Sequence, residues 1–209
     1  MSSKPRLWTK GFILDTLVNF LIYIIYYMLM VIIASEAIHS LNASMSEAGL
    51  ASGIFILGTL VARLFAGRSV ELYGRRKMLF AGIIFYLATT FMYFGIHSMA
   101  MLFLVRCLNG IGYGIASTAT STIVSTMIPA ERRGEGINYY ALSMSLAAAI
   151  GPFIGMLMQQ IFPFEDIIYF CIAMIVVCLG AASVMHVEEM ELTEEHRAAL
   201  KEIHTANFL

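Results

Sequence analysis

Six long apolar segments constrain the fold of this chain more than any other feature. They cover approximately residues 11–38, 46–67, 77–96, 99–123, 138–162 and 166–186. An α-helix of about 20 apolar residues is long enough to cross the hydrocarbon core of a bilayer. Of all residues, 59% are hydrophobic and only 13% are charged, and the mean hydropathy is +0.80. Because a soluble domain would carry about 25% charged residues, the sequence predicts an all-α integral membrane protein: a bundle of six transmembrane helices within residues 11–186.

The distribution of positive charge predicts how this bundle lies in the membrane. Of the 13 Lys and Arg residues, eleven lie on one side of the predicted spans: Lys4, Arg6, Lys10, Arg68, Arg75, Arg76, Lys77, Arg132, Arg133, Arg197 and Lys201. The loops of the other side contain none. Since Lys and Arg mark the cytoplasmic side, we expect a multi-pass protein of the plasma membrane with both termini in the cytoplasm. Residues 1–10 would form the cytoplasmic N-terminus and residues 187–209 a cytoplasmic linker or tail.

Composition and motifs argue against several other classes of protein. No basic patch interleaved with aromatic residues is present, so nucleic-acid binding is not expected. The three cysteines all lie in apolar segments without zinc-ligand spacing, and the five histidines are scattered over loops and ends. No nucleophile with a nearby base is recognisable. We therefore expect no enzyme, no metal and no organic cofactor.

The connection between the second and third spans is basic and contains two glycines. Gly67 and Gly74 allow a tight turn there. Glu71, between them, can pair with the cations that follow, Arg75 and Arg76. Taken alone, the connection can be simply a basic loop that sets the topology.

Arg106 is one of two cations inside an apolar segment. A buried arginine costs about 2.5–3.5 kcal/mol on an insertion scale, so such a residue usually faces a cavity or has a partner. Asn109, Tyr113 and Ser117 follow at helical spacing. This polar stripe predicts the wall of a central cavity; the alternative is hydrogen bonding between helices.

The first span contains a second set of polar residues. Asp15 is followed by Asn19 and Tyr26 on roughly the same side. Asp15 and Arg106 are predicted near opposite faces of the membrane, whereas Glu36 is closer in depth to Arg106. The hypothesis is that Asp15 or Glu36 is a protonatable group in transport coupling; the alternative is that both are carboxylates at helix ends.

The fifth span carries a Gly-Pro pair. Gly151 and Gly155, four residues apart, allow close approach of helix backbones. Pro152 removes a backbone hydrogen bond and permits a kink. The pattern predicts a place where helix packing can rearrange.

Together these motifs resemble the N-terminal six-helix half of a transporter of the major facilitator superfamily. The family's loop motif is matched by Gly67, Glu71, Gly74, Arg75 and Arg76, with Glu71 in place of the usual Asp and Leu72 in place of a frequent Arg. Arg106, Asn109 and Gly110 match the motif of its fourth span. Gly151, Pro152 and Gly155 match the fifth-span motif of antiporters, with Met156 in place of its last Gly.

The resemblance implies a 3+3 helix repeat and alternating access to a small-molecule site, with protons as the coupling ion and efflux of drugs or small metabolites as the function. It assigns a gating role to Glu71 and Arg75, proton coupling to Arg106, and the contact between two halves to Gly151 and Pro152. An uptake carrier of the same fold and a non-transporting membrane subunit remain alternatives. Because full transporters of this family contain two such halves, we expect a fragment or truncated form that needs its second half, or a half-transporter that forms a homodimer.

Overall fold

The computed structural model describes residues 5–187, and within this range the chain is helical without any β-strand. Six helices are long and apolar enough to cross a membrane, which confirms the predicted six-helix bundle. They are α1 (Lys10–Leu41), α2 (Met45–Tyr73), α3 (Arg75–Phe91), α4 (Met99–Met127), α5 (Arg133–Ile161) and α6 (Phe164–Val184). Short 3-10 helices, η1 (Met92–Gly95) and η2 (Ala130–Arg132), precede α4 and α5. The predicted tail lies, apart from Val187, outside the described residues.

Three of the helices begin at residues that are good N-caps. Thr9 caps α1, and its side chain accepts a hydrogen bond from the backbone N–H of Phe12 at 3.2 Å. Ser44 and Glu47 form a reciprocal capping box at the start of α2, and Ser98 caps α4. These side chains satisfy N–H groups that have no partner inside the helix. Two of the uncharged breaks in the apolar pattern, before α2 and before α4, therefore become well-defined turns.

The connection between α2 and α3 is shorter than the sequence predicts. Gly67 does not form part of a loop, because α2 continues through it to Tyr73. Only Gly74 separates the two helices, with φ 98° and ψ 138°. A positive φ of this kind is readily adopted by glycine alone. The turn therefore depends on a single glycine, and the helical hydrogen bonds of α2 override the glycine at position 67.

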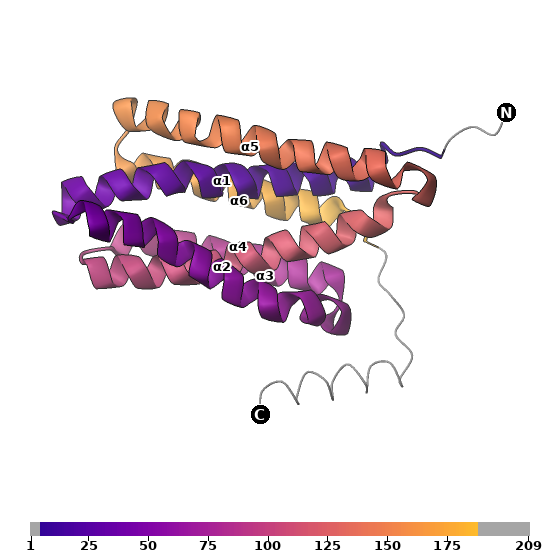
Figure 1. Cartoon of the computed structure of the whole chain (residues 1–209), viewed down its shortest axis with the longest axis horizontal. Coiled ribbons are helices and arrows are strands. Elements are labelled where there is room, and N and C mark those ends of the chain that lie inside the picture. The colour runs from indigo at the N-terminus through magenta and orange to yellow at the C-terminus, as the bar shows by residue number, and fades with distance from the viewer. Residues whose placement is uncertain (1–4, 188–209) are drawn as a thin grey trace.

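The six helices form two groups of three, which Figure 1 shows as two layers: α1, α5 and α6 above, and α2, α3 and α4 below. The main contacts are those of α4 with α2 and α3, and those of α1 with α5 and α6. Exchanging α1, α2, α3 for α4, α5, α6 leaves this pattern unchanged, as a 3+3 repeat requires. The two groups meet where α1 touches α4 and α2, and where α3 touches α6.

Glycines let α2 and α4 pack with their backbones in contact. A Cβ at Gly58 would overlap the carbonyl oxygen of Cys107, and a Cβ at Gly110 would overlap that of Phe55. Such close approach of small residues is a common way for helices to associate in a membrane. The close α2–α4 contact therefore places Arg106 of α4 within hydrogen-bond distance of the α2 backbone.

Candidate functional site

Arg106 of α4 is completely buried and has partners on two other elements. Its Nε donates to the carbonyl oxygen of Ala51 in α2 at 3.1 Å, and its Nη1 donates to the hydroxyl of Tyr93 in η1 at 3.3 Å. Its guanidinium also lies 4.5 Å from the ring centroid of Phe55, a cation–π distance. No carboxylate contacts it within residues 5–187. Dipoles and an aromatic ring within the group of α2, α3 and α4 therefore compensate the charge in part, while Nη2 has no hydrogen-bond partner among the described residues.

Asn109 continues this network toward α3. Its amide nitrogen donates to the hydroxyls of Thr89 and Thr90, both at 3.1 Å, and its oxygen accepts from Tyr93 at 3.4 Å. Ser117, two turns further along α4, donates to the carbonyl oxygen of Gly114 in its own helix. Both side chains are buried, and Asn109 makes hydrogen bonds between helices, the alternative considered for the polar stripe, whereas Ser117 bonds only within α4.

Asp15 of α1 is also completely buried, but it has no such partners. Neither of its carboxylate oxygens has a hydrogen-bond partner within residues 5–187. An isolated ionised carboxylate is very costly in a medium of low polarity, whereas a neutral carboxyl group is far less so. Asp15 is therefore a buried carboxyl group whose hydrogen-bonding capacity is not met by the described residues.

One helical turn from Asp15 lies a polar network that joins α1, α4 and α5. Asn19 accepts a hydrogen bond from Thr120 of α4 at 3.3 Å and donates to Ser143 of α5 at 3.5 Å. Tyr140 of α5 donates to the same Thr120 hydroxyl at 3.1 Å. Asp15 therefore lies beside hydrogen bonds that connect the two groups of three helices.

A cleft of about 270 Å³ lies where α1, α2 and α4 meet. Its aromatic residues are Tyr23, Tyr26, Tyr27, Phe55 and Tyr113, and Ile56, Thr59 and Arg63 of α2 complete it. Tyr26 stacks on Phe55, with ring centroids 5.0 Å apart and planes inclined by 20°. Of the five residues predicted to line a cavity, Tyr26 and Tyr113 border this cleft, and Asn19, Asn109 and Ser117 do not.

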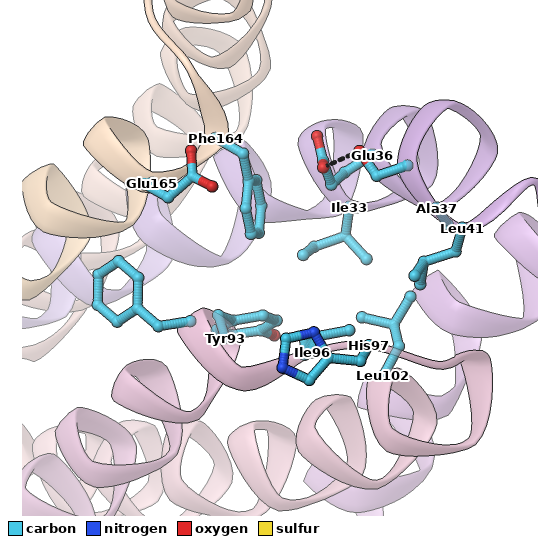
Figure 2. Close-up of a pocket in the computed structure, with 12 residues that line it drawn as sticks. Ile33, Glu36, Ala37, Leu41, Tyr93, Ile96, His97, Leu102, Phe164 and Glu165 are labelled. Carbon is cyan, nitrogen blue, oxygen red and sulfur yellow. Dashed lines mark hydrogen bonds between the residues drawn. The ribbon is translucent and has the colours of Figure 1, made fainter.

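A second cavity, of about 260 Å³, lies at the end of the bundle where α1 ends and α4 begins. Figure 2 shows Glu36 and Glu165 on one side of it, and Tyr93 and His97 on the other. Glu36 accepts a hydrogen bond from Ser40. Tyr93 borders this cavity and contacts Arg106, so the cavity leads to the arginine network.

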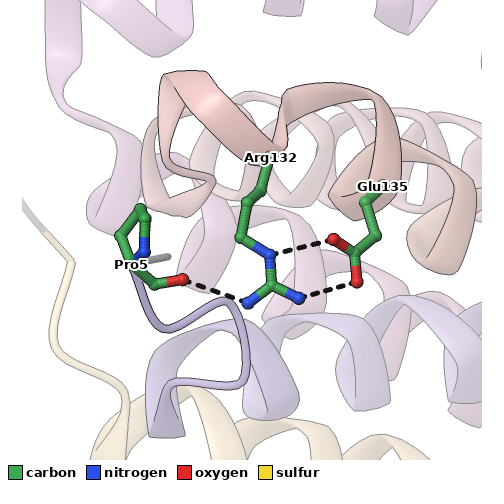
Figure 3. Close-up of polar contacts among 3 residues, drawn as sticks. All are labelled: Pro5, Arg132 and Glu135. Carbon is green, nitrogen blue, oxygen red and sulfur yellow. Dashed lines mark hydrogen bonds and ion pairs between the residues drawn. The ribbon is translucent and has the colours of Figure 1, made fainter. Parts of the chain in front are cut away.

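At the opposite end, cations connect neighbouring helices. Arg76 at the start of α3 donates to the carbonyl oxygen of Ser183 in α6 at 3.1 Å. Arg75 is buried, and Glu71 is exposed. Arg132 forms a two-pronged ion pair with Glu135 and donates to the carbonyl oxygen of Pro5 at 3.0 Å, as Figure 3 shows. This contact joins the N-terminal segment to the turn before α5.

A family model described as Major Facilitator Superfamily matches residues 16–205. The chain belongs to this superfamily. It is 28% identical over 132 residues to an uncharacterized MFS-type transporter of Methanocaldococcus jannaschii, covering 63% of this chain and 34% of that protein. It is 24% identical over 170 residues to multidrug resistance protein 1 of Bacillus subtilis, covering 81% of this chain and 43% of that protein.

Solved structures of the superfamily share the fold. A crystal structure of a mutant of the peptide transporter POT matches with a TM-score of 0.77 at 17% identity, over 95% of this chain and 44% of that one. The chain spans less than half the length of these relatives. This match establishes the fold of a six-helix half. The family model and the six apolar helices establish that the chain is a multi-pass membrane protein.

In this superfamily chain, the fifth-span glycines have a local packing role. A Cβ at Gly151 would lie 2.8 Å from the Cβ of Tyr27, and one at Gly155 would lie 3.1 Å from Met28. These glycines therefore let α5 approach α1 within the same six-helix bundle. Contact of Gly151 and Pro152 with a second half stays a prediction, as do the gating role of the α2–α3 turn and the coupling roles of Asp15, Glu36 and Arg106.

The residues of these networks that sequence reasoning missed include Thr89, Thr90, Tyr93, Tyr140 and Ser143. Tyr140 and Ser143 are three residues apart on α5, the spacing of one helix face, and that spacing is the signal that could have found them. Tyr93 lies in a 3-10 turn with no pattern to identify it. Within residues 5–187, no group of three or more His, Cys, Asp or Glu side chains could hold a metal ion.

Proposed function

We propose that this chain forms one six-helix half of a secondary transporter of the plasma membrane that exports drugs or small metabolites in exchange for protons. Its likeness to a multidrug resistance protein supports efflux. The arrangement of Lys and Arg supports cytoplasmic termini. The counterpart half is a second six-helix bundle or a second copy of this chain, since the chain matches only 34% and 43% of the length of these two superfamily relatives.

The observation that carries the proposal is the burial of Asp15 without a hydrogen-bond partner. A proton-carrying side chain must be able to exist in both its protonated and its ionised form. The change in its charge must also alter the packing of the surrounding helices. Asp15 is buried without a partner, and the hydrogen bonds next to it join α1 to α4 and α5. Ionisation would draw water or polar groups toward Asp15, and these helix contacts would rearrange. Proton loss and helix movement are thereby coupled.

The test is flux in vesicles that contain the purified chain. A pH gradient is imposed, and the accumulation of fluorescent dyes of both charge signs is followed while the oligomeric state is measured. We expect accumulation that collapses when the gradient is dissipated. Asp15→Asn, which fixes the neutral form, should abolish the response to pH. Asp166→Asn, an exposed acid at the start of α6, is the matched control and should keep it.

Other outcomes would redirect or contradict the proposal. Loss of the pH response in Glu36→Gln, with retention in Asp15→Asn, would move the proton site to the cavity of Figure 2. Dye movement that runs down its own gradient and ignores pH would contradict proton coupling. Absence of flux from both monomer and dimer would contradict transport by this chain alone and favour a subunit role.

A further inference from the structure

We propose that the cleft between α1, α2 and α4 binds aromatic organic anions, with Arg63 selecting the charge and the tyrosines holding the ring. This inference rests on the proposed transport function and names its substrate class. Arg63 is the second arginine inside an apolar segment, and unlike Arg106 its side chain is exposed.

Arg63 has no carboxylate partner within residues 5–187. It borders the cleft together with Thr59, one helical turn away on α2. An arginine within a transmembrane segment is costly and usually faces a cavity or a pathway rather than lipid. A guanidinium offers five N–H donors in a fixed planar arrangement that fits a carboxylate, sulfonate or phosphate group. Arg63 is therefore positioned to bind an anionic group of a ligand.

The aromatic side chains in the rest of the cleft are suited to a flat aromatic ligand. The ring of Tyr26 lies 4.7 Å from that of Tyr27 and 5.1 Å from that of Tyr113, measured between centroids. Aromatic rings at such separations attract further rings in offset or edge-on arrangements. The hydroxyls of Tyr26 and Tyr27, which border the cleft with Arg63, have no hydrogen-bond partner in the described part of the chain and are available as donors to a ligand.

The charges around the cleft select against cations. Tyrosine faces alone would also attract an organic cation. However, no Asp or Glu borders the cleft, and Phe55 at its base is in contact with a second guanidinium, that of Arg106. Both nearby full charges are therefore positive. A cationic ligand would be repelled where an anionic one is attracted, and the low polarity of the site strengthens both effects.

Equilibrium binding to the purified full chain in lipid nanodiscs tests this without requiring transport. Three probes share one ring system: naphthalene-2-carboxylate, 2-naphthylmethanol and 2-naphthylmethylammonium. Affinities are measured by calorimetry at neutral pH. We expect the anion to bind about tenfold or more tightly than the neutral probe, as one charge-assisted, two-pronged hydrogen bond predicts. The cation should bind more weakly than both.

Variants separate the two parts of the cleft. Arg63→Gln should remove the preference for the anion and leave the neutral probe within about threefold, because only the charge is lost. Tyr26→Leu should weaken all three probes together. Arg133→Gln, an exposed cation at the start of α5, is the control and should change nothing. Thermal melts of each variant show whether it is folded.

Equal binding of the anion and the neutral probe, or an anion preference that survives in Arg63→Gln, would overturn the inference, as would the absence of binding by all three. Each of these results leaves proton-coupled flux of other compounds intact. Conversely, anion-selective binding without any flux would support this cleft while contradicting the proposed transport.

Discussion

Arg106 and Asp15, both completely buried in this bundle, are held in opposite ways. Arg106 lies near the end of the bundle where α4 begins, donates to Ala51 and Tyr93, and lies against Phe55. Asp15 lies near the other end and has no hydrogen-bond partner among residues 5–187. A charge with permanent partners stabilises one arrangement of helices. A buried acid without partners changes its surroundings whenever it gains or loses a proton.

The position of each group reinforces the difference. The partners of Arg106 all belong to the tightly packed group of α2, α3 and α4, with the η1 turn that follows α3. Asp15 lies beside the seam between the two groups of helices, next to the hydrogen bonds of Asn19 to α4 and α5. We infer that the arginine network holds its own group of helices together, and that the aspartate lies where the two groups can shift against each other.

The largest expected effect comes from removing the arginine. Arg106→Ala removes two hydrogen bonds donated by a charged group, to the carbonyl of Ala51 and to the hydroxyl of Tyr93, and each such bond contributes about 1.5–3 kcal/mol. We expect the free energy of unfolding to fall by about 3 kcal/mol, measured by SDS titration with circular dichroism. Arg106→Lys should lose less unfolding free energy, since its ammonium group can still donate a hydrogen bond. A loss below about 1 kcal/mol in the alanine variant would show that Arg106 is not the structural charge of the pair.

A smaller effect should follow from separating the helices that hold this arginine. In Gly110→Ala the new methyl group would overlap the carbonyl of Phe55, and overpacking of this kind costs about 1–3 kcal/mol. Gly53→Ala is the matched control on α2, because nothing lies within 4 Å of its Cβ position. Alanine should raise helix stability there by a few tenths of a kcal/mol or more. Equal melting of the two variants would contradict the close α2–α4 contact.

The aspartate should behave differently from the arginine in the same assay. Asp15→Asn removes no hydrogen bond seen in the described residues, so we expect a change in unfolding free energy of less than about 1 kcal/mol, in either direction. The carboxylic acid C=O band in infrared difference spectra, recorded between acidic and alkaline pH, should lose one component. A loss of stability as large as that of Arg106→Ala would contradict the contrast between the two groups.

The smallest effect should come from an exposed charge contact. Arg132→Gln removes the ion pair with Glu135 and the hydrogen bond to Pro5, and exposed pairs contribute at most about 1 kcal/mol. Trp8, the only tryptophan, lies 4.8 Å from the ring of Tyr139 and reports on this segment. We expect easier quenching of its fluorescence by acrylamide with little change in melting. Arg133→Gln is the control, and identical quenching in both would contradict the role of Arg132.

Much of the architecture follows directly from the sequence. Hydropathy gave the number of helices, since a bilayer requires apolar segments of one length. The motifs around Gly74, Arg106 and Gly151 gave the family, which the family model confirms. The helices extend beyond the predicted spans: α2 continues to Tyr73 although its apolar part ends at Gly67, and α5 begins at Arg133, before the span predicted from residue 138. Helical hydrogen bonds extend beyond the membrane core, where hydropathy no longer reports on them.

What only the tertiary structure decided is the set of partners around each buried charge. By itself the sequence placed Arg106 and Asp15 in apolar segments and at different depths. It could not show that Arg106 binds the backbone of Ala51, because every residue has a carbonyl and none is marked as an acceptor. Nor could it place Asp15 beside hydrogen bonds to Thr120 and Ser143, which lie more than 100 residues away along the chain. The physical reason is that the hydropathy of a single segment shows whether a residue lies in a membrane-spanning helix. The hydrogen-bond partners of a buried charge, in contrast, depend on how several helices pack together.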